Sequence, residues 1–165
     1  MPFNIPRLLR RARFLSPRRR LEWYPPFWLM GVRVVELDDG WMRVRLCLPL
    51  NVRSRNLGDA MFGGYQAALA DPVAALACAR QFPGYSVWTR TLSLDFERPG
   101  DTDLELRFEF DPAQREQIRL DLERRGRSTP EFEYGLYLGD GTRCTRVLCS
   151  VAIRPREYTG SRRRP

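Results

Sequence analysis

A glycine pair followed by a long alanine-rich segment constrains the fold of this chain more than any other feature. Gly63 and Gly64 have no Cβ, so the backbone there can turn sharply and another molecule can approach closely. The following residues, to about residue 80, are strong helix formers, and seven of the positions between 67 and 79 are alanine. A helix with such small side chains is thin. We therefore expect a helix from about residue 62 to about residue 80, with a sheet wrapped closely around it.

The start of this helix is suited to an anion or a polarised carbonyl oxygen. Its first N–H groups have no acceptor within the helix, and the helix dipole adds partial positive charge. Asp71 lies seven residues beyond Gly64, close to two turns, and so on the glycine face. Pro72 removes a backbone hydrogen bond, which predicts a kink or a restart with Asp71 as the cap. Capping alone would explain Asp71, but an ionised carboxylate held at a helix start would also suit a nucleophile or a general base.

Segments of alternating polarity flank the helix on both sides. Period-two patterns predict strands near residues 32–37, 41–48, 86–98, 104–110, 131–138 and 142–154. Short turns at 38–40, 99–101 and 139–141 require antiparallel pairing. A charged helix is expected over residues 112–127. The order indicates an α+β fold in which one antiparallel sheet wraps around one long central helix.

The positive charge of the chain is concentrated at its two ends. Its net charge is +8, and all 28 basic residues are arginine. Seven of these arginines lie in residues 1–20, and three lie in residues 162–164. The body keeps 18 arginines and all 20 acids. We expect a basic arm or helix over residues 1–25, one domain over 26–155, and a disordered basic tail over 156–165. A basic start would also fit a presequence or a membrane-surface helix, but a short amphipathic helix packed on the body is the favoured interpretation.

The composition excludes several classes of site. The chain has no histidine, so catalytic triads with histidine and histidine-ligated zinc are impossible, and acid–base chemistry falls to carboxylates. The four cysteines, Cys47, Cys78, Cys144 and Cys149, form no Cys-x-x-Cys pair and are expected to be reduced. No metal site and no cofactor are predicted. No run of about 18 apolar residues is present, so we expect a soluble, cytoplasmic protein.

The stretch from Asn56 to Asp71 resembles the hotdog-fold acyl-CoA thioesterases, in particular their phenylacetate-pathway branch. The signature of that family is an Asn or Gln, then His-Gly-Gly, then an acidic residue on the helix. The resemblance implies that the Gly63 N–H polarises the thioester carbonyl, that Asp71 is nucleophile or general base, and that Asn56 orients water or substrate. Phe62 stands in place of the usual His, and Ala75 in place of a hydroxyl residue found in some members. This Phe-Gly-Gly version looks most like the uncharacterised relatives, which carry a domain of unknown function.

The same resemblance implies how the protein assembles and what it binds. Residues 87–101 are similar to the strand that lies across the dimer contact in hotdog proteins, so a homodimer or a dimer of dimers is expected. Gly64, Phe62, Tyr65 and Trp88 are candidates to bind an acyl-CoA substrate, and arginines near the mouth could receive its phosphates.

Three functions remain open from the sequence. The first is an acyl-thioester hydrolase. The alternative is a non-catalytic acyl-CoA or lipid-binding dimer in which Phe62 closes the site to water. A nucleic-acid-binding dimer that uses the arginine ends is the weakest, because phosphate attraction alone gives no specific recognition.

Overall fold

The computed structural model describes residues 16–157. The elements follow in the order α2 (Pro17–Glu22), α3 (Pro25–Met30), β1 (Arg33–Leu37), β2 (Arg43–Leu48), α4 (Gly63–Gln81), β3 (Tyr85–Phe96), β4 (Leu104–Glu109), α5 (Pro112–Arg125), β5 (Glu131–Tyr137) and β6 (Arg143–Pro155). The helices predicted near residues 62–80 and 112–127 and all six predicted strands are present, with ends shifted by a few residues.

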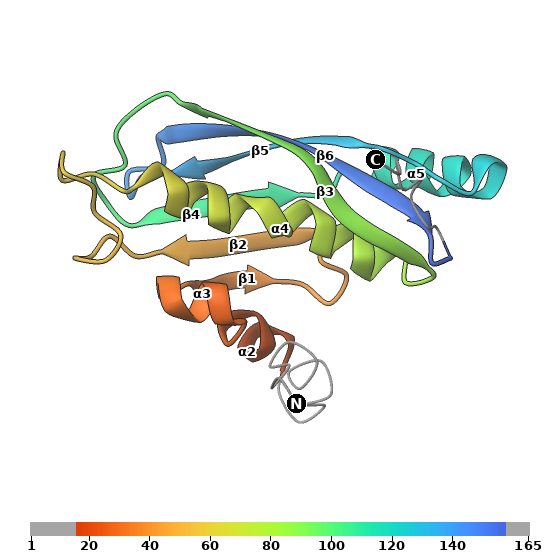
Figure 1. Ribbon diagram of the computed structural model, residues 1–165, viewed down its shortest axis with the longest axis horizontal. Helices are drawn as coiled ribbons and strands as arrows, with labels where there is room; N and C mark the ends of the chain where they lie inside the picture. The colour runs from red at the N-terminus through yellow and green to blue at the C-terminus, as the bar shows by residue number, and fades with distance from the viewer. Residues whose placement is uncertain (1–15, 158–165) are drawn as a thin grey trace, which may run out of the picture.

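The six strands form one antiparallel sheet in the order β1-β2-β4-β5-β6-β3. Figure 1 shows α4 lying across one face of this sheet, with α2 and α3 beside β1 and with α5 at the end away from the start of α4. The strands β1 and β3 are the two edges. The expected antiparallel sheet around a central helix is confirmed.

The core lies between α4 and the sheet. The buried face of α4 carries Leu69, Ala70, Val73, Ala74, Ala77 and Cys78, and inward residues of the strands, such as Leu46, Leu106 and Val147, are fully buried against it. Burying one such leucine or valine contributes about 1.5–3 kcal/mol to the free energy of unfolding. The alanines keep α4 thin, so the curved sheet approaches its backbone closely.

The predicted restart at Pro72 is wrong. The helix α4 is continuous from Gly63 to Gln81 with Pro72 inside it, and its N-cap is Phe62. Pro72 deprives only the Ala68 carbonyl of its partner, and Ala68 is exposed, so water can replace the lost hydrogen bond. The neighbours Ala70 and Val73 are both buried, and packing holds the helix together across the proline. Asp71 is therefore not a helix cap.

The segment before β1 packs on the domain. The Arg18 guanidinium donates to the carbonyl oxygens of Val34 at 2.6 Å and Val35 at 3.1 Å, and Glu22 accepts from the Val34 N–H at 3.0 Å. These bonds occupy backbone groups of an edge strand that would otherwise be open to another chain. Residues 16–25 thus belong to the packed domain, whereas the expectations for residues 1–15 and for the tail beyond 157 lie outside the described residues. Over residues 16–157 no helix is long and apolar enough to cross a membrane.

Candidate functional site

The start of α4 presents free backbone donors. Phe62, the N-cap, has an extended backbone (φ −63°, ψ 127°) and makes no side-chain cap, and no acidic residue occupies the first turn. The N–H groups of Gly63 and Gly64 therefore have no acceptor within the helix. The loop before them is fixed, because the Phe62 N–H donates to the Ser54 carbonyl and the Met61 N–H to the Gly100 carbonyl, both at 2.7 Å.

A buried polar pair anchors this helix start to the sheet. Gln66 and Thr145 are both buried, and the Thr145 hydroxyl donates to the Gln66 side-chain oxygen at 2.5 Å. The Gln66 amide nitrogen also donates to the Met61 carbonyl at 3.4 Å. Removing either side chain would leave a buried polar group without its partner, which costs about 1–3 kcal/mol. No local pattern indicates this pair, because its two members are 79 positions apart along the chain.

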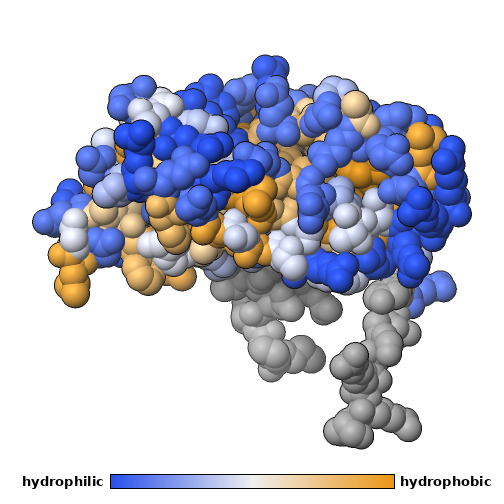
Figure 2. All heavy atoms as spheres, turned by 90° about the horizontal axis from the view of Figure 1, so that it is seen from above, coloured by the Kyte–Doolittle hydropathy of each residue, from blue (hydrophilic) through white to orange (hydrophobic). Residues whose placement is uncertain are grey.

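Aromatic rings cover the glycine pair. A Cβ on Gly63 would lie 2.9 Å from Cζ of Phe96, and a Cβ on Gly64 would collide with the ring of Phe62. The rings of Phe62 and Tyr65 meet edge to face at a centroid distance of 6.3 Å. Phe62 and Phe96 are each 52% exposed. In Figure 2 the hydrophobic side chains at the surface gather on the side of α4, toward the end where this helix begins.

Two of the predicted site residues lie apart from this cluster. Trp88, which is 41% exposed, is on β3 eight residues before Phe96, which corresponds to about 26 Å along a strand. The side-chain oxygen of Asn56 accepts from the N–H groups of Gly58 at 2.8 Å and Ala60 at 3.2 Å. Asn56 thereby shapes the loop that leads to the glycines, and its amide NH₂ is the part left to meet a ligand.

Asp71 lies on an exposed turn in the middle of α4. Its backbone carbonyl accepts from the Thr89 hydroxyl of β3 at 2.7 Å, which fixes this turn against the edge strand. The buried Tyr134 hydroxyl donates to the carbonyl of the preceding residue, Ala70, at 2.8 Å. The sequence pattern placed neither Thr89 nor Tyr134 at this turn, although both lie on segments whose alternation predicts a strand.

Asp71 acts electrostatically on two buried groups beneath it. Burial raises the pKa of Tyr134 far above its usual range, and Cys149 and the Asp71 carboxylate add to this rise. Burial also raises the pKa of Cys149, partly offset by a hydrogen bond to Tyr134, and Asp71 raises it further. Both groups stay neutral at pH 7, so neither is an acid or a base for catalysis there. Over residues 16–157 no cluster of three or more metal-ligating side chains is present.

Asp71 and the Gly63 N–H cannot act on one carbonyl within a single chain. They are separated by eight residues of helix, which corresponds to about 12 Å along the axis. A general base and an oxyanion donor must each come within about 3 Å of their target atoms. A site that uses both groups therefore requires two copies of the chain.

The architecture is shared with several solved structures, among them one described as a thioesterase. A Pseudomonas aeruginosa protein of unknown function, PA5026, described as a probable thioesterase, matches with a TM-score of 0.74 and 19% identity, over 94% of this chain and 97% of that one. The thioesterase HI1161 of Haemophilus influenzae matches with a TM-score of 0.66 and 13% identity, over 85% of this chain and 90% of that one. The Escherichia coli PaaI protein from the phenylacetic acid degradation operon matches with a TM-score of 0.60 and 16% identity, over 82% of this chain and 88% of that one. At these identities the matches establish the fold, and the predicted hotdog fold is confirmed.

Residues 18–151 match the family model of a domain of unknown function, DUF4442. The chain belongs to this family. No curated protein matches it.

Proposed function

We propose that this protein is an acyl-CoA thioesterase. The observation that carries the proposal is the uncapped start of α4, where two free N–H groups lie under aromatic rings, with a carboxylate two turns further along the same helix. The Gly63 N–H would stabilise the oxyanion that forms on the thioester carbonyl. Phe62, Tyr65 and Phe96 would cover the acyl chain, with Gly64 allowing its close approach, and the Asn56 amide would orient water or substrate.

Asp71 would serve as the general base or the nucleophile. As a base, it takes a proton from a water molecule whose oxygen attacks the thioester carbon, and collapse of the oxyanion expels the thiolate of coenzyme A. The products are the carboxylic acid and, after the thiolate takes a proton, the free thiol. As a nucleophile, its carboxylate attacks the carbon directly and the thiolate of coenzyme A leaves as the C–S bond breaks; water then hydrolyses the resulting anhydride to the carboxylic acid and the free Asp71 carboxylate.

The active unit would be a homodimer joined through β3. Among the described residues this 12-residue edge strand pairs on one side only, with β6. A long edge with exposed aromatic residues is suited to pairing with a second copy. Such a contact would bring Gly63 of one copy toward Asp71 of the other, as the 12 Å separation within one chain requires. A dimer of dimers is compatible with the same unit.

The alternative is an acyl-CoA or lipid-binding dimer without turnover. It is supported by the Phe62 ring, which lies against Gly64 where the thioesterases of this type carry histidine, and which would exclude water from the carbonyl.

A turnover assay separates the two functions. Release of the coenzyme A thiol is measured over a range of acyl chain lengths for the wild type, Asp71→Asn, and Asp39→Asn as the matched control in an exposed turn. We expect the Asp71 variant to fall at least about 100-fold and the control to match the wild type. Both variants should unfold within about 0.5 kcal/mol of the wild type, because both side chains are exposed. A wild type that binds acyl-CoA but hydrolyses none would establish the binding protein instead.

A further inference from the structure

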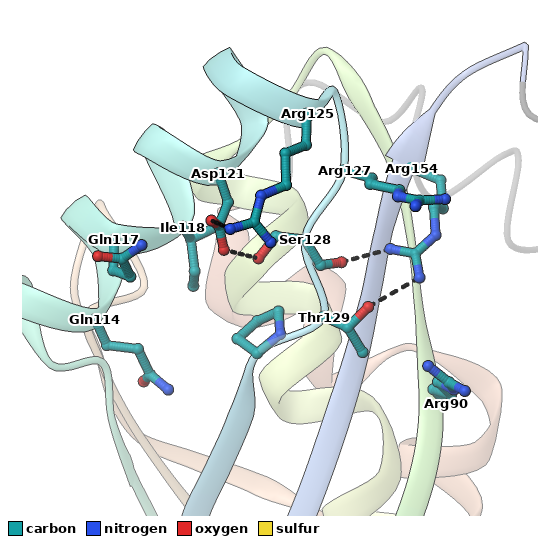
Figure 3. A pocket seen from close by; sticks show the side chains of 11 residues that line it. Arg90, Gln114, Gln117, Ile118, Asp121, Arg125, Arg127, Ser128, Thr129 and Arg154 are labelled. Carbon is teal, nitrogen blue, oxygen red and sulfur yellow. Dashed lines mark hydrogen bonds and ion pairs between the residues drawn. The ribbon is translucent and has the colours of Figure 1, made fainter.

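A cavity of about 630 Å³ lies at the end of the sheet where α5 is found. Figure 3 shows α5 on one side of it and the strands β6 and β3 on the other. The helix contributes Gln114, Gln117, Asp121 and Arg125, the following segment Arg127, Ser128 and Thr129, and the strands Arg154 and Arg90. This volume is in the range of sites for small molecules.

The connection from α5 to β5 builds the cavity. The helix ends at Gly126, whose positive φ of 66° reverses the chain. Ser128 then forms a two-way bridge with Ile153 of β6, with N–O distances of 3.2 and 3.0 Å. Ile118 of α5, which is buried, is also one of the residues that line the cavity. The polar lining is thus held by backbone hydrogen bonds and a packed helix.

Four arginines line this cavity against a single carboxylate. Asp121 is already engaged, because it accepts from the Ser128 hydroxyl at 3.2 Å and pairs with Arg125 at 3.7 Å. Arg154 donates only to neutral oxygens, among them the Thr129 hydroxyl at 2.8 Å. Its position is fixed, but its charge is not neutralised.

The side chains of Arg90 and Arg127 make no hydrogen bond or ion pair within residues 16–157. Arg90 is the extra residue of a bulge between Thr89 and Thr91, so it has no register partner on β6. The body of the chain has slightly more acids than arginines, so this excess of positive charge is a local feature. Three uncompensated guanidinium groups around one cavity repel one another, and an anion with several oxygens would relieve that repulsion.

We propose that this cavity binds the phosphate groups of a nucleotide-sized ligand, and that the ligand is the nucleotide end of coenzyme A. The first part rests on the cavity alone, and the second rests on the proposed function. Guanidinium forks match phosphate oxygens in a bidentate manner, and a ligand with two or more phosphates supplies the charge that the arginines lack. The glutamine amides can donate to and accept from the rest of the ligand.

The cavity is also connected to the candidate site. Thr89 bonds to the Asp71 carbonyl, and Arg90 is the next residue on the same edge strand. Neighbouring strand residues point to opposite faces, so these two positions lie on either side of β3. Because the β3 edge itself is the proposed dimer contact, an elongated ligand would reach the Asp71 turn with one end and the arginines with the other by passing around the Tyr85 end of β3.

Calorimetric titration tests the proposal on the full chain. The probes are coenzyme A, dephospho-coenzyme A, adenosine 3′,5′-bisphosphate, ATP and inorganic phosphate. Each probe is titrated into the wild type, into the double variant Arg90→Gln/Arg127→Gln, and into the control variant Arg124→Gln. Arg124 is an exposed arginine of α5 that does not line the cavity, so its variant controls for the loss of a positive charge from nearby surface. We expect the double variant to bind adenosine 3′,5′-bisphosphate and coenzyme A at least about ten- to a hundredfold more weakly, with the control unchanged. Binding should weaken as salt is raised.

The outcomes separate this inference from the proposed function. If thioesters are hydrolysed in an Asp71-dependent manner but the double variant binds every probe as the wild type does, the cavity is not a phosphate site and the thioesterase proposal stands. If no thioester is hydrolysed but phosphate-bearing probes still depend on both arginines, the cavity is a phosphate site and the thioesterase proposal fails. Binding of ATP that depends on the arginines, without binding of coenzyme A, would assign the cavity to free nucleotides and overturn the coenzyme A assignment.

Discussion

The N–H of Gly63 can be removed without dismantling the helix. Proline has no N–H, and the first position of a helix tolerates it because its N–H has no intrahelical acceptor. The preceding residue, Phe62, already has the extended backbone that proline demands (φ −63°, ψ 127°). The new Cβ would lie 2.9 Å from the tip of the Phe96 ring, and that ring is half exposed and free to move.

Gly63→Ala is the matched control for Gly63→Pro. It adds the same Cβ against Phe96 but keeps the N–H. Loss of one oxyanion donor lowers kcat by about 10²–10³, or about 2.7–4 kcal/mol of transition-state stabilisation. We therefore expect Gly63→Pro to lose two to three orders of magnitude in kcat and Gly63→Ala to lose only a few-fold.

The assay compares kcat and KM for the acyl-CoA that the wild type hydrolyses fastest, with a thermal melt for each variant. Proline at a compatible position restricts the unfolded chain and should leave stability equal or raised by about 0.4–1 kcal/mol. Equal losses of kcat in the alanine and proline variants would refute the reasoning, because contact with Phe96 rather than the N–H would then be the cause. A fully active Gly63→Pro variant would also refute the reasoning, because the Gly63 N–H would then not be needed for catalysis.

Three further predictions follow from the same contacts. Co-expression of Asp71→Asn with Gly63→Pro should restore about a quarter of the wild-type rate. Half of the dimers are mixed, and each mixed dimer carries one intact site out of two. No recovery of activity in the mixed dimers would argue against a shared site. Burial opposes ionisation of Glu105, but hydrogen bonds from Arg107 and Arg45 outweigh it and lower its pKa. The stabilisation that these bonds provide is present above the unfolded pKa of about 4.3 and is lost as the pH falls through the lower folded value. Glu105→Gln should thus cost about 1 kcal/mol at pH 7 in urea unfolding and nothing at about pH 2, and a cost that does not depend on pH would contradict this. Burial raises the pKa of Cys78 to about 12, and the nearby Cys149 adds to this rise. Burial also raises the pKa of Cys47, although a hydrogen bond from Arg33 partly offsets the rise. Iodoacetamide should therefore modify only Cys47, which is partly exposed, in the folded protein, slowly at pH 7 and faster toward pH 9. Modified Cys78 in the mass spectrum would instead show that the core opens.

The sequence by itself determined the local structure and the fold class. The period-two segments became strands, and the alanine-rich segment became the central helix. The turns at 38–40 and 139–141 became the β1–β2 and β5–β6 hairpins. The pairing expected across the turn at 99–101 is wrong, because β3 pairs with β6 and β4 pairs with β2 and β5. These features depend on neighbours within a few residues, which is the range over which backbone preference and side-chain periodicity act. The hotdog fold followed from the resemblance together with this order. The roles of Gly63, Asp71 and Asn56 were also suggested by the resemblance, and they stay predictions.

Only the tertiary structure decided which distant groups meet. Local propensity predicted a break at Pro72, but burial on both sides of it kept α4 continuous and removed the capping role of Asp71. The strands β3 and β6 pair residues that are 49 to 70 positions apart. This pairing set Phe96 over Gly63 and Thr89 against the Asp71 turn. The arginine-lined cavity likewise draws on α5, its following loop, β6 and β3. No short-range pattern predicts these long-range contacts, because they form when the sheet closes around the helix. At that stage the packing of the whole core outweighs the local preference of any one segment.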